Sequence, residues 1–286
     1  MGIVEGQVAV VTGAGRGFGR AIAERLAAEG ANVALLSRSL TQLDEVADAI
    51  RRAGGKAIGV RCDVTDPHSI EHGIAKVEEL LGPVDLLVNN AGVPGPFGPI
   101  WEVDPDEWWK AQAVHIRAPM LFLARVLPGM IERGRGRAIC ISAIASRMVA
   151  PNLSAYCTGK IAQNRLVAEA AAETAGTGVA VFAIDPGFVF TELARQTMES
   201  ADAQKYLGGM VERLRKAEID PAAQADLARC AQRVLDLASG KYDALSGGYY
   251  ELPDDLDGER AKAGRGAPRS GSPARRTGLP STPWWP

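Results

Sequence analysis

Short apolar runs alternate with amphipathic stretches along most of the chain, and this alternation restricts the fold more than any other feature. The amphipathic stretches repeat their apolar residues at helical spacing, most clearly near 70–81, 107–132 and 156–175. Apolar strands joined by helices form a parallel sheet that is covered on both faces. The pattern therefore predicts one doubly wound α/β domain, with strands at Val8–Val11, Asn32–Leu36, Ala57–Val60, Val84–Val88, Ala138–Ile141 and Val179–Ile184.

The last third of the sequence follows a different pattern. Weaker helical periodicity at 192–217 and 221–238 indicates a cap and a closing helix, and Gly247–Glu251 fits a final strand. From residue 258 onward, Gly, Pro and Ser supply 13 of 29 residues, beside six basic side chains and one acidic one. Such a composition builds no core. We therefore expect a domain over 1–257 and a disordered basic tail over 258–286.

Charge and cysteine content exclude several classes of function. The formal net charge is −2, and with the basic tail set aside the remaining chain is negative, which argues against nucleic-acid binding. Four cysteines and three histidines show no zinc-type spacing, so we expect no metal site, and scattered thiols are typical of a reducing compartment. The first residues contain no basic leader, and no apolar run approaches about 18 residues. We expect a cytoplasmic protein without a membrane segment.

A glycine-rich turn, TGAGRGFG, lies between the first predicted strand and the first predicted helix. A dinucleotide pyrophosphate binds to backbone N–H groups at a helix N-terminus, where side chains would obstruct it. Glycines at the right places in a strand–turn–helix context therefore predict a Rossmann-type nucleotide site. The residues concerned are Gly13, Arg16, Gly17, Phe18 and Gly19.

The ends of the next strands indicate which dinucleotide binds. An acidic residue after the second strand would accept from the NAD ribose, but this chain has Ser37 and Arg38 there, and Arg16 lies in the turn. Guanidinium groups and a hydroxyl suit a 2′-phosphate, so we expect NADP(H). Asp63, followed by Val64, is placed to accept from the adenine amino group. The fourth strand ends in Asn89, Asn90, Ala91 and Gly92, at the sheet edge where ligands bind.

Tyr156 and Lys160 open a predicted helix four residues apart, so both lie on one face of it. A neighbouring ammonium is expected to lower the pKa of the phenol toward a useful range. Lys160 can also donate to the nicotinamide ribose. We interpret the two residues as an acid/base pair.

Four motifs, TGxxxGxG, NNAG, YxxxK and Asp185-Pro186-Gly187, occur in order, and with them the chain resembles the classical short-chain dehydrogenase/reductase family over roughly residues 5–252. The resemblance implies that the glycine turn, Asn89 and the residues after it hold the cofactor. It also implies that 188–217 is a mobile substrate lid. The loop expected to contact the carboxamide contains Pro186, Gly187, Val189 and Thr191.

The chain departs from the family pattern at three positions. Ala143 stands where the family has a Ser that binds the substrate carbonyl oxygen, and we consider Ser142 as its replacement if the strand end bulges; Ser146 is a more distant substitute. His115 stands where an Asn holds a water in a proton relay to the Lys, and an imidazole can donate and accept there or titrate. YxxSK becomes YxxGK through Gly159.

The sequence supports three hypotheses. The first is an NADPH-dependent ketoreductase or alcohol dehydrogenase that acts on a bulky, largely apolar compound, for which a secondary metabolite would fit. Its catalytic residues would be Tyr156, Lys160, His115 and Ser142. The second is a non-redox enzyme, a dehydratase or cyclase, that uses Tyr156 as acid or base. The third is an NADPH-binding protein with reduced activity.

Apolar residues on more than one face of 107–132 and 156–175 predict a homodimer or homotetramer, because a helix that only covers a sheet needs one apolar face. Trp101, Trp108 and Trp109 are expected to pack within the helical layer.

Overall fold

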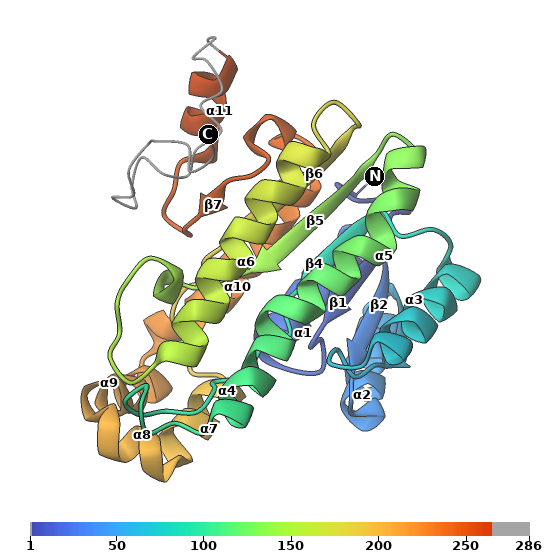
Figure 1. Cartoon of the computed structure of the whole chain (residues 1–286). Coiled ribbons are helices and arrows are strands. Elements are labelled where there is room, and N and C mark those ends of the chain that lie inside the picture. Colours follow the sequence, from blue (N-terminus) through green and yellow to red (C-terminus); the bar gives the residue numbers. More distant parts are fainter. Residues whose placement is uncertain (1, 265–286) are drawn as a thin grey trace.

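The computed structural model describes residues 2–264, without the side chains of residues 222 and 223. Seven strands form one parallel sheet in the order β3-β2-β1-β4-β5-β6-β7 (Figure 1). This confirms the predicted doubly wound α/β fold. The strands are β1 (Val8–Thr12), β2 (Asn32–Ser37), β3 (Lys56–Arg61), β4 (Leu86–Asn89), β5 (Gly136–Ile141), β6 (Val179–Ile184) and β7 (Tyr249–Tyr250).

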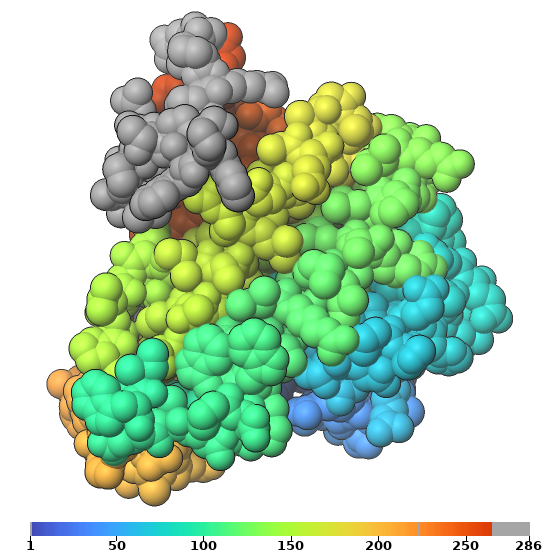
Figure 2. Space-filling view, viewed as in Figure 1, coloured from blue at the N-terminus to red at the C-terminus, as the bar shows by residue number. Residues whose placement is uncertain are grey.

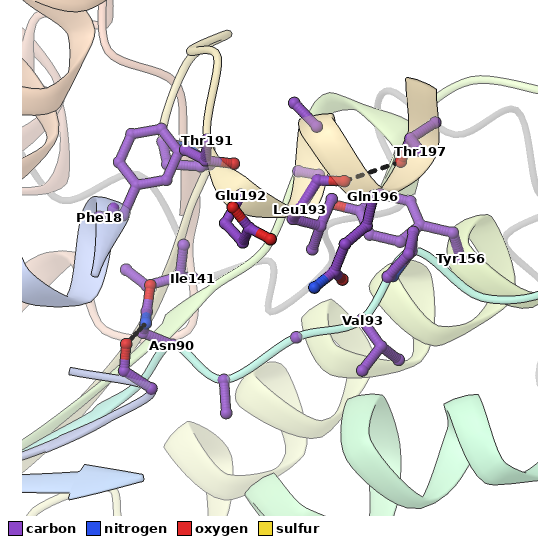
Figure 3. A pocket seen from close by; sticks show the side chains of 18 of the residues that line it. Phe18, Asn90, Val93, Ile141, Tyr156, Thr191, Glu192, Leu193, Gln196 and Thr197 are labelled. Carbon is purple, nitrogen blue, oxygen red and sulfur yellow. Dashed lines mark hydrogen bonds between the residues drawn. The ribbon is translucent and has the colours of Figure 1, made fainter. Parts of the chain in front are cut away.

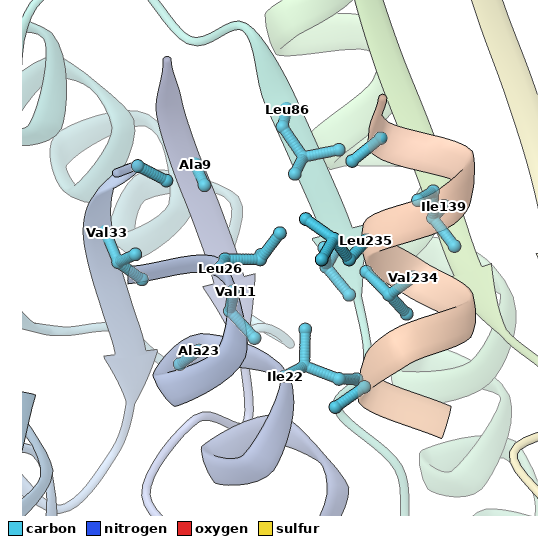
Figure 4. Close-up of a cluster of buried hydrophobic side chains, with 14 of the residues drawn as sticks. Ala9, Val11, Ile22, Ala23, Leu26, Val33, Leu86, Ile139, Val234 and Leu235 are labelled. Carbon is cyan, nitrogen blue, oxygen red and sulfur yellow. The ribbon is translucent and has the colours of Figure 1, made fainter. Parts of the chain in front are cut away.

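Helices cover both faces of the sheet, because the strands carry apolar side chains on both faces. One face packs against α1 (Gly17–Ala28), α2 (Leu40–Arg52) and α10 (Pro221–Ala238). Figure 4 shows the centre of this layer, where Ile22 and Leu26 of α1 meet Val234 and Leu235 of α10 over the strands. The opposite face packs against α3 (Pro67–Leu81), α5 (Ala118–Glu132) and α6 (Ser154–Glu173).

The predicted helix over 107–132 is three consecutive segments. α4 (Pro105–Gln112) continues into a π-helical segment, Ala113–Arg117, and then into α5. The whole stretch Pro105–Glu132 is long and apolar enough to cross a membrane by length and composition, and 44% of its most apolar window is buried. Phe122 and Met130 pack against the strands, so contact with the sheet accounts for part of this apolar character, while Trp109 and Met120 are exposed.

Three short helices stand over the carboxyl edge of the sheet, where one weakly helical stretch was predicted. They are α7 (Glu192–Glu199), α8 (Ala201–Tyr206) and α9 (Gly208–Ile219). Ser200 separates the first two, and its hydroxyl accepts from the backbone N–H of Ala203, which caps α8. We call α7–α9 the cap. It encloses the cavity described below.

The boundary predicted at residue 257 is wrong. Residues 256–264 form a helix, α11 (Leu256–Gly264), although 258–264 was assigned to a disordered tail. Leu256 is buried, and Asp257 at the start of the helix bonds to Lys241 and to the hydroxyl of Tyr242. Acidic residues in the first turn and Lys262 in the last also suit the helix dipole. The rest of the expected tail, 265–286, lies outside the described residues.

Large apolar side chains are exposed on the face formed by α4, α5 and α6, which is the face seen in Figure 2. Trp109 is 69% exposed, Ile161 49% and Met120 42%. Trp101, at the start of the segment that leads into α4, is 80% exposed. The expectation that these tryptophans pack within the helical layer is therefore wrong for Trp101 and Trp109. Trp108 is partly buried, and its indole N–H donates to Ser154.

Candidate active site

A cavity of about 660 Å³ opens at the carboxyl ends of the strands, beneath the cap. One half is lined by the glycine turn and the tips of β2 and β3. The other half is lined by apolar side chains from the loop after β4, the loop after β5 and the cap. In Figure 3, Phe18 and Asn90 lie on one side of the cavity and Tyr156 on the other, with Leu193 and Gln196 of α7 between them. Every site residue predicted from the sequence lines this cavity except Gly19, Asn89, His115 and Ser146.

The glycine turn is held against the end of β4 by two side chains. The Thr12 hydroxyl accepts from the backbone N–H groups of Asn90 (2.9 Å) and Ala91 (3.0 Å). The Asn90 amide donates to the carbonyls of Thr12 (2.8 Å) and Gly13 (3.3 Å). Asn90 therefore shapes the turn, in addition to lining the cavity. Asn89 is buried, and its amide contacts the Cys140 sulfur at 3.8 Å, away from the cavity.

Two glycines of this turn cannot be replaced without displacing the backbone. A Cβ atom on Gly19 would lie 2.3 Å from the Gly13 carbonyl oxygen, so helix α1 approaches the turn too closely for any side chain. Gly13 itself has φ +66°, which L side chains rarely adopt. Gly19 therefore acts in the site by allowing this close approach, although it does not line the cavity.

The start of α1 is suited to bind an anion. Arg16 occupies the N-cap position without a side-chain hydrogen bond to the helix, and no acidic residue follows in the first turn. The N-terminal N–H groups of a helix need acceptors, and the helix dipole favours negative charge there. Because Gly13, Gly15 and Gly17 line the same part of the cavity, these residues fit the pyrophosphate of a dinucleotide.

Ser37 and Arg38 stand at the tip of β2, on the cavity wall. Arg38 is exposed, and no hydrogen bond or ion pair occupies its guanidinium within the described part of the chain. Asp63, at the end of β3, accepts from the backbone N–H and the hydroxyl of Thr65 at 2.9 and 2.7 Å. These bonds, and then the charges of Arg38 and Arg61, lower the pKa of Asp63. The region thus presents one fixed carboxylate and one available guanidinium.

Tyr156 and Lys160 lie on one face of α6 as predicted, but their electrostatics differ from the expectation. The Lys160 Nζ atom is 5.6 Å from the centre of the Tyr156 ring. Burial, together with the nearby Asp185 carboxylate, raises the pKa of Tyr156. The prediction that Lys160 lowers this pKa is therefore wrong for this structure. Burial lowers the pKa of Lys160 itself to about 8.

His115 is completely buried in the π-helical segment. Its Nε2 donates to the Val93 carbonyl at 2.8 Å, which leaves Nδ1 as an acceptor, and Nδ1 has no partner among the described residues. The ring meets the Tyr156 ring edge to face, with centres 5.3 Å apart. Burial and the charge of Lys160 lower the pKa of His115 to about 3. His115 therefore stays neutral, which contradicts the alternative that it titrates in the physiological range.

Ser142 lines the cavity, but its hydroxyl is engaged within the protein. This hydroxyl donates to the backbone carbonyl of Lys160 at 3.4 Å, and the side chain is buried. The more distant substitute, Ser146, is buried and accepts from the Asn164 amide at 2.8 Å. Ala143 has an extended backbone and lines the cavity. The structure therefore does not support Ser142 as the replacement for the family's serine. Ala143 itself has no hydroxyl that could donate to a substrate oxygen.

The loop after β6 forms the wall between the two halves of the cavity. Gly187 has φ +85°, and a Cβ there would lie 2.4 Å from Asp226 of α10. The Asp226 carboxylate accepts from the backbone N–H of Phe188 at 3.1 Å. α10 therefore fixes the loop that carries Val189 and Thr191 to the cavity.

Sequence reasoning missed several polar residues of the cavity. Gln42 lies behind the glycine turn, and Gln196 and Arg213 line the cap half. The Arg213 guanidinium stacks 4.2 Å from the centre of the Phe188 ring. These side chains belong to helices whose sequence carries no motif, so the sequence gives no signal that places them in the cavity.

The fold and this site define a class of α/β protein. In this class, a glycine-rich turn that fits a dinucleotide and a Tyr–Lys pair lie at the same edge of the sheet. Residues 7–202 match the family model for short chain dehydrogenases, and the chain belongs to this family. It is 36% identical over 259 residues to a short chain dehydrogenase of Pseudocercospora fijiensis, covering 89% of this chain and 82% of that protein.

Two further relatives carry more specific descriptions. A 2-(R)-hydroxypropyl-CoM dehydrogenase of Xanthobacter autotrophicus is 35% identical over 221 residues, covering 76% of this chain and 87% of that protein. A metagenomic short-chain oxidoreductase crystallised in complex with NADP is 33% identical, with a TM-score of 0.68, covering 83% of this chain and 92% of that chain.

Proposed function

We propose that this protein is an NADPH-dependent oxidoreductase that interconverts a ketone and an alcohol in a bulky, largely apolar compound. One observation carries the proposal: Tyr156 stands on the cavity wall with Lys160 beside it, in a cavity that joins the glycine turn to an apolar chamber. The chamber contains Val93, Met148 and several cap side chains, and these suit an apolar reactant. Arg38 and the NADP-bound relative support the choice of NADPH.

The residues suggest how the reaction proceeds toward the alcohol. When bound, NADPH would supply a hydride to the carbonyl carbon, and the Tyr156 hydroxyl would give its proton to the carbonyl oxygen. Because the pKa of Tyr156 is raised, the phenol is protonated at neutral pH, which is the form that this step uses. The phenolate that remains lies beside the Lys160 ammonium until Tyr156 is reprotonated.

Tyr156→Phe tests this role. Without the phenolic proton, kcat for ketone reduction should fall by about 100-fold or more, because positioned acids contribute about 10²–10⁴. NADPH consumption with a panel of apolar ketones measures kcat, and fluorescence titration measures NADPH binding, which should change little. Tyr206→Phe is the control, since its hydroxyl bonds to Glu102 away from the cavity. Full activity in Tyr156→Phe would overturn the mechanism.

Arg38→Asp tests whether the cofactor is NADPH instead of NADH. Losing a charge-assisted contact with the 2′-phosphate and gaining a carboxylate should weaken NADPH binding about 10- to 100-fold and improve NADH binding. Arg61→Asp introduces the same charge change at the end of β3, at a residue outside the cavity lining. Calorimetric titration of both cofactors gives the ratio of dissociation constants. An unchanged ratio in Arg38→Asp would contradict the NADPH assignment.

A second candidate function has an observation in its favour. Ala143 and the engaged hydroxyl of Ser142 leave the substrate oxygen without the second donor of the family pattern. Losing one such donor typically costs about 10²–10³ in rate. A non-redox enzyme or an NADPH-binding protein has less need of this donor. Tight NADPH binding, with no NADPH oxidation by any ketone, would favour this second candidate.

A further inference from the structure

The ammonium of Lys160 is held by two acceptors inside the protein. Lys160 is 3% exposed, and its Nζ donates to the Ile141 carbonyl at 2.8 Å and to the Gln163 side-chain oxygen at 3.2 Å. Gln163 is 1% exposed and lies one helical turn after Lys160 on α6. An ammonium has three N–H donors. Two are therefore engaged with the protein, and because Lys160 lines the cavity, the third is available on that side.

No carboxylate forms an ion pair with this ammonium among residues 2–264. The titratable groups around it are Tyr156 on α6, His115 on the π-helical segment, Cys140 on β5 and Asp185 after β6. His115 and the Cys140 thiol are neutral, since burial disfavours their charged forms. Burying an ammonium without a paired charge is costly unless its hydrogen bonds are satisfied. Among the described residues, only Ile141 and Gln163 accept hydrogen bonds from the Lys160 ammonium.

We infer that Gln163 is a positioning residue: its side-chain oxygen fixes the Lys160 ammonium against β5 and keeps it charged, so that the remaining N–H faces the cavity. This inference rests on the proposed role of Lys160 in catalysis. The charged form of Lys160 is lost as pH rises through its pKa of about 8. Any change in the acceptor at position 163 should therefore move the alkaline limit of activity.

Two substitutions at position 163 should act in opposite directions. Gln163→Leu removes one acceptor from a buried cation and should lower the pKa of Lys160 by about one unit. Gln163→Glu brings a carboxylate to the ammonium and should raise it. NMR titration of the lysine side chain, assigned with Lys160→Arg, measures this pKa in the protein without substrate. The alkaline limb of kcat/KM against pH should move the same way in each variant.

Asn164→Leu is the matched control. Asn164 is the next residue on α6, and its amide donates to the Ser146 hydroxyl at 2.8 Å instead of contacting Lys160. This variant should leave the Lys160 titration unchanged. If Gln163→Leu does not fold, Gln163→Met removes the same acceptor with less change of shape.

The outcomes separate this inference from the proposed function. The role of Gln163 would be overturned if the pKa of Lys160 were the same in every protein. These proteins are the parent, Gln163→Leu or Gln163→Met, and Gln163→Glu. Opposite shifts in protein that reduces no ketone at any pH would uphold the role of Gln163 and overturn the proposed oxidoreductase activity. Opposite NMR shifts that are matched by shifts in kcat/KM would support both.

Discussion

Gly159 lies where α6 crosses the π-helical segment, between Tyr156 and Lys160 in sequence. A Cβ atom there would lie 2.6 Å from the Cβ of His115 and 2.9 Å from its Cγ. Side-chain atoms of His115 therefore occupy the space that a side chain at position 159 would need. The glycine of YxxGK and the histidine of VHI are thus two parts of one packing arrangement.

Gly159→Ala should lower the free energy of unfolding. Alanine gains up to about 1 kcal/mol of helix propensity, but overpacking a core position costs about 1–3 kcal/mol. We expect a net loss of about 1–2 kcal/mol, measured by urea denaturation.

Gly209→Ala provides the comparison, because Gly209 is also helical and a Cβ there would meet no atom within 4 Å. This second variant should be at least as stable as the parent protein. A Gly159→Ala protein that gains stability to the same extent would show that α6 and the π-helical segment can move apart freely.

The pairing of Tyr156 with Lys160 was predictable from spacing, but their protonation was not. Spacing places two side chains on one helix face, whereas a pKa depends on how much water the folded chain removes and on charges from distant segments. Asp185, from the loop after β6, acts on Tyr156 in this way. The engaged hydroxyl of Ser142 depends on the local path of the chain after β5, which side-chain alternation alone does not give.

At the scale of elements, strands were predicted well because a buried strand is apolar along its whole length. β6 has the predicted bounds, Val179–Ile184. Helix interruptions were predicted poorly. The π-helical segment has the same composition as its neighbours, so the spacing of apolar residues over 107–132 predicts one continuous helix. α11 was missed because glycines and charged residues make up most of it and only Leu256 is buried. Contacts with Lys241 and Tyr242, distant in sequence, stabilise its start.

At the scale of the whole molecule, the exposed apolar face over α4, α5 and α6 requires an explanation. Contiguous apolar surface of this kind marks contact sites. Trp109, Met120 and Ile161 come from three different helices and are exposed together. We propose that a second copy of the chain covers this face, in agreement with the homo-oligomer expected from the sequence.

Ile161→Glu combined with Trp109→Ser should therefore shift the protein to a monomer. Placing a charge at the centre of an apolar contact removes its favourable burial and leaves an unpaired carboxylate. Light scattering coupled to size-exclusion chromatography measures the mass. Ile219→Glu alters an equally apolar and more exposed residue at the end of α9 and should leave the mass unchanged. A parent protein that is already monomeric would contradict the proposal.

The π-helical segment also determines how this chain can change in length. Its wider turn accommodates about one residue more than an α-helix of equal rise. Deleting a single residue from Ala113–Arg117 would therefore restore regular winding and leave α5 in its present orientation relative to α4. Phe122 and Met130 would keep their places against the sheet, whereas His115 would lose its position opposite the Val93 carbonyl. A shortened descendant of this sequence could keep the whole helix–sheet interface and lose only the contacts that the wider turn makes.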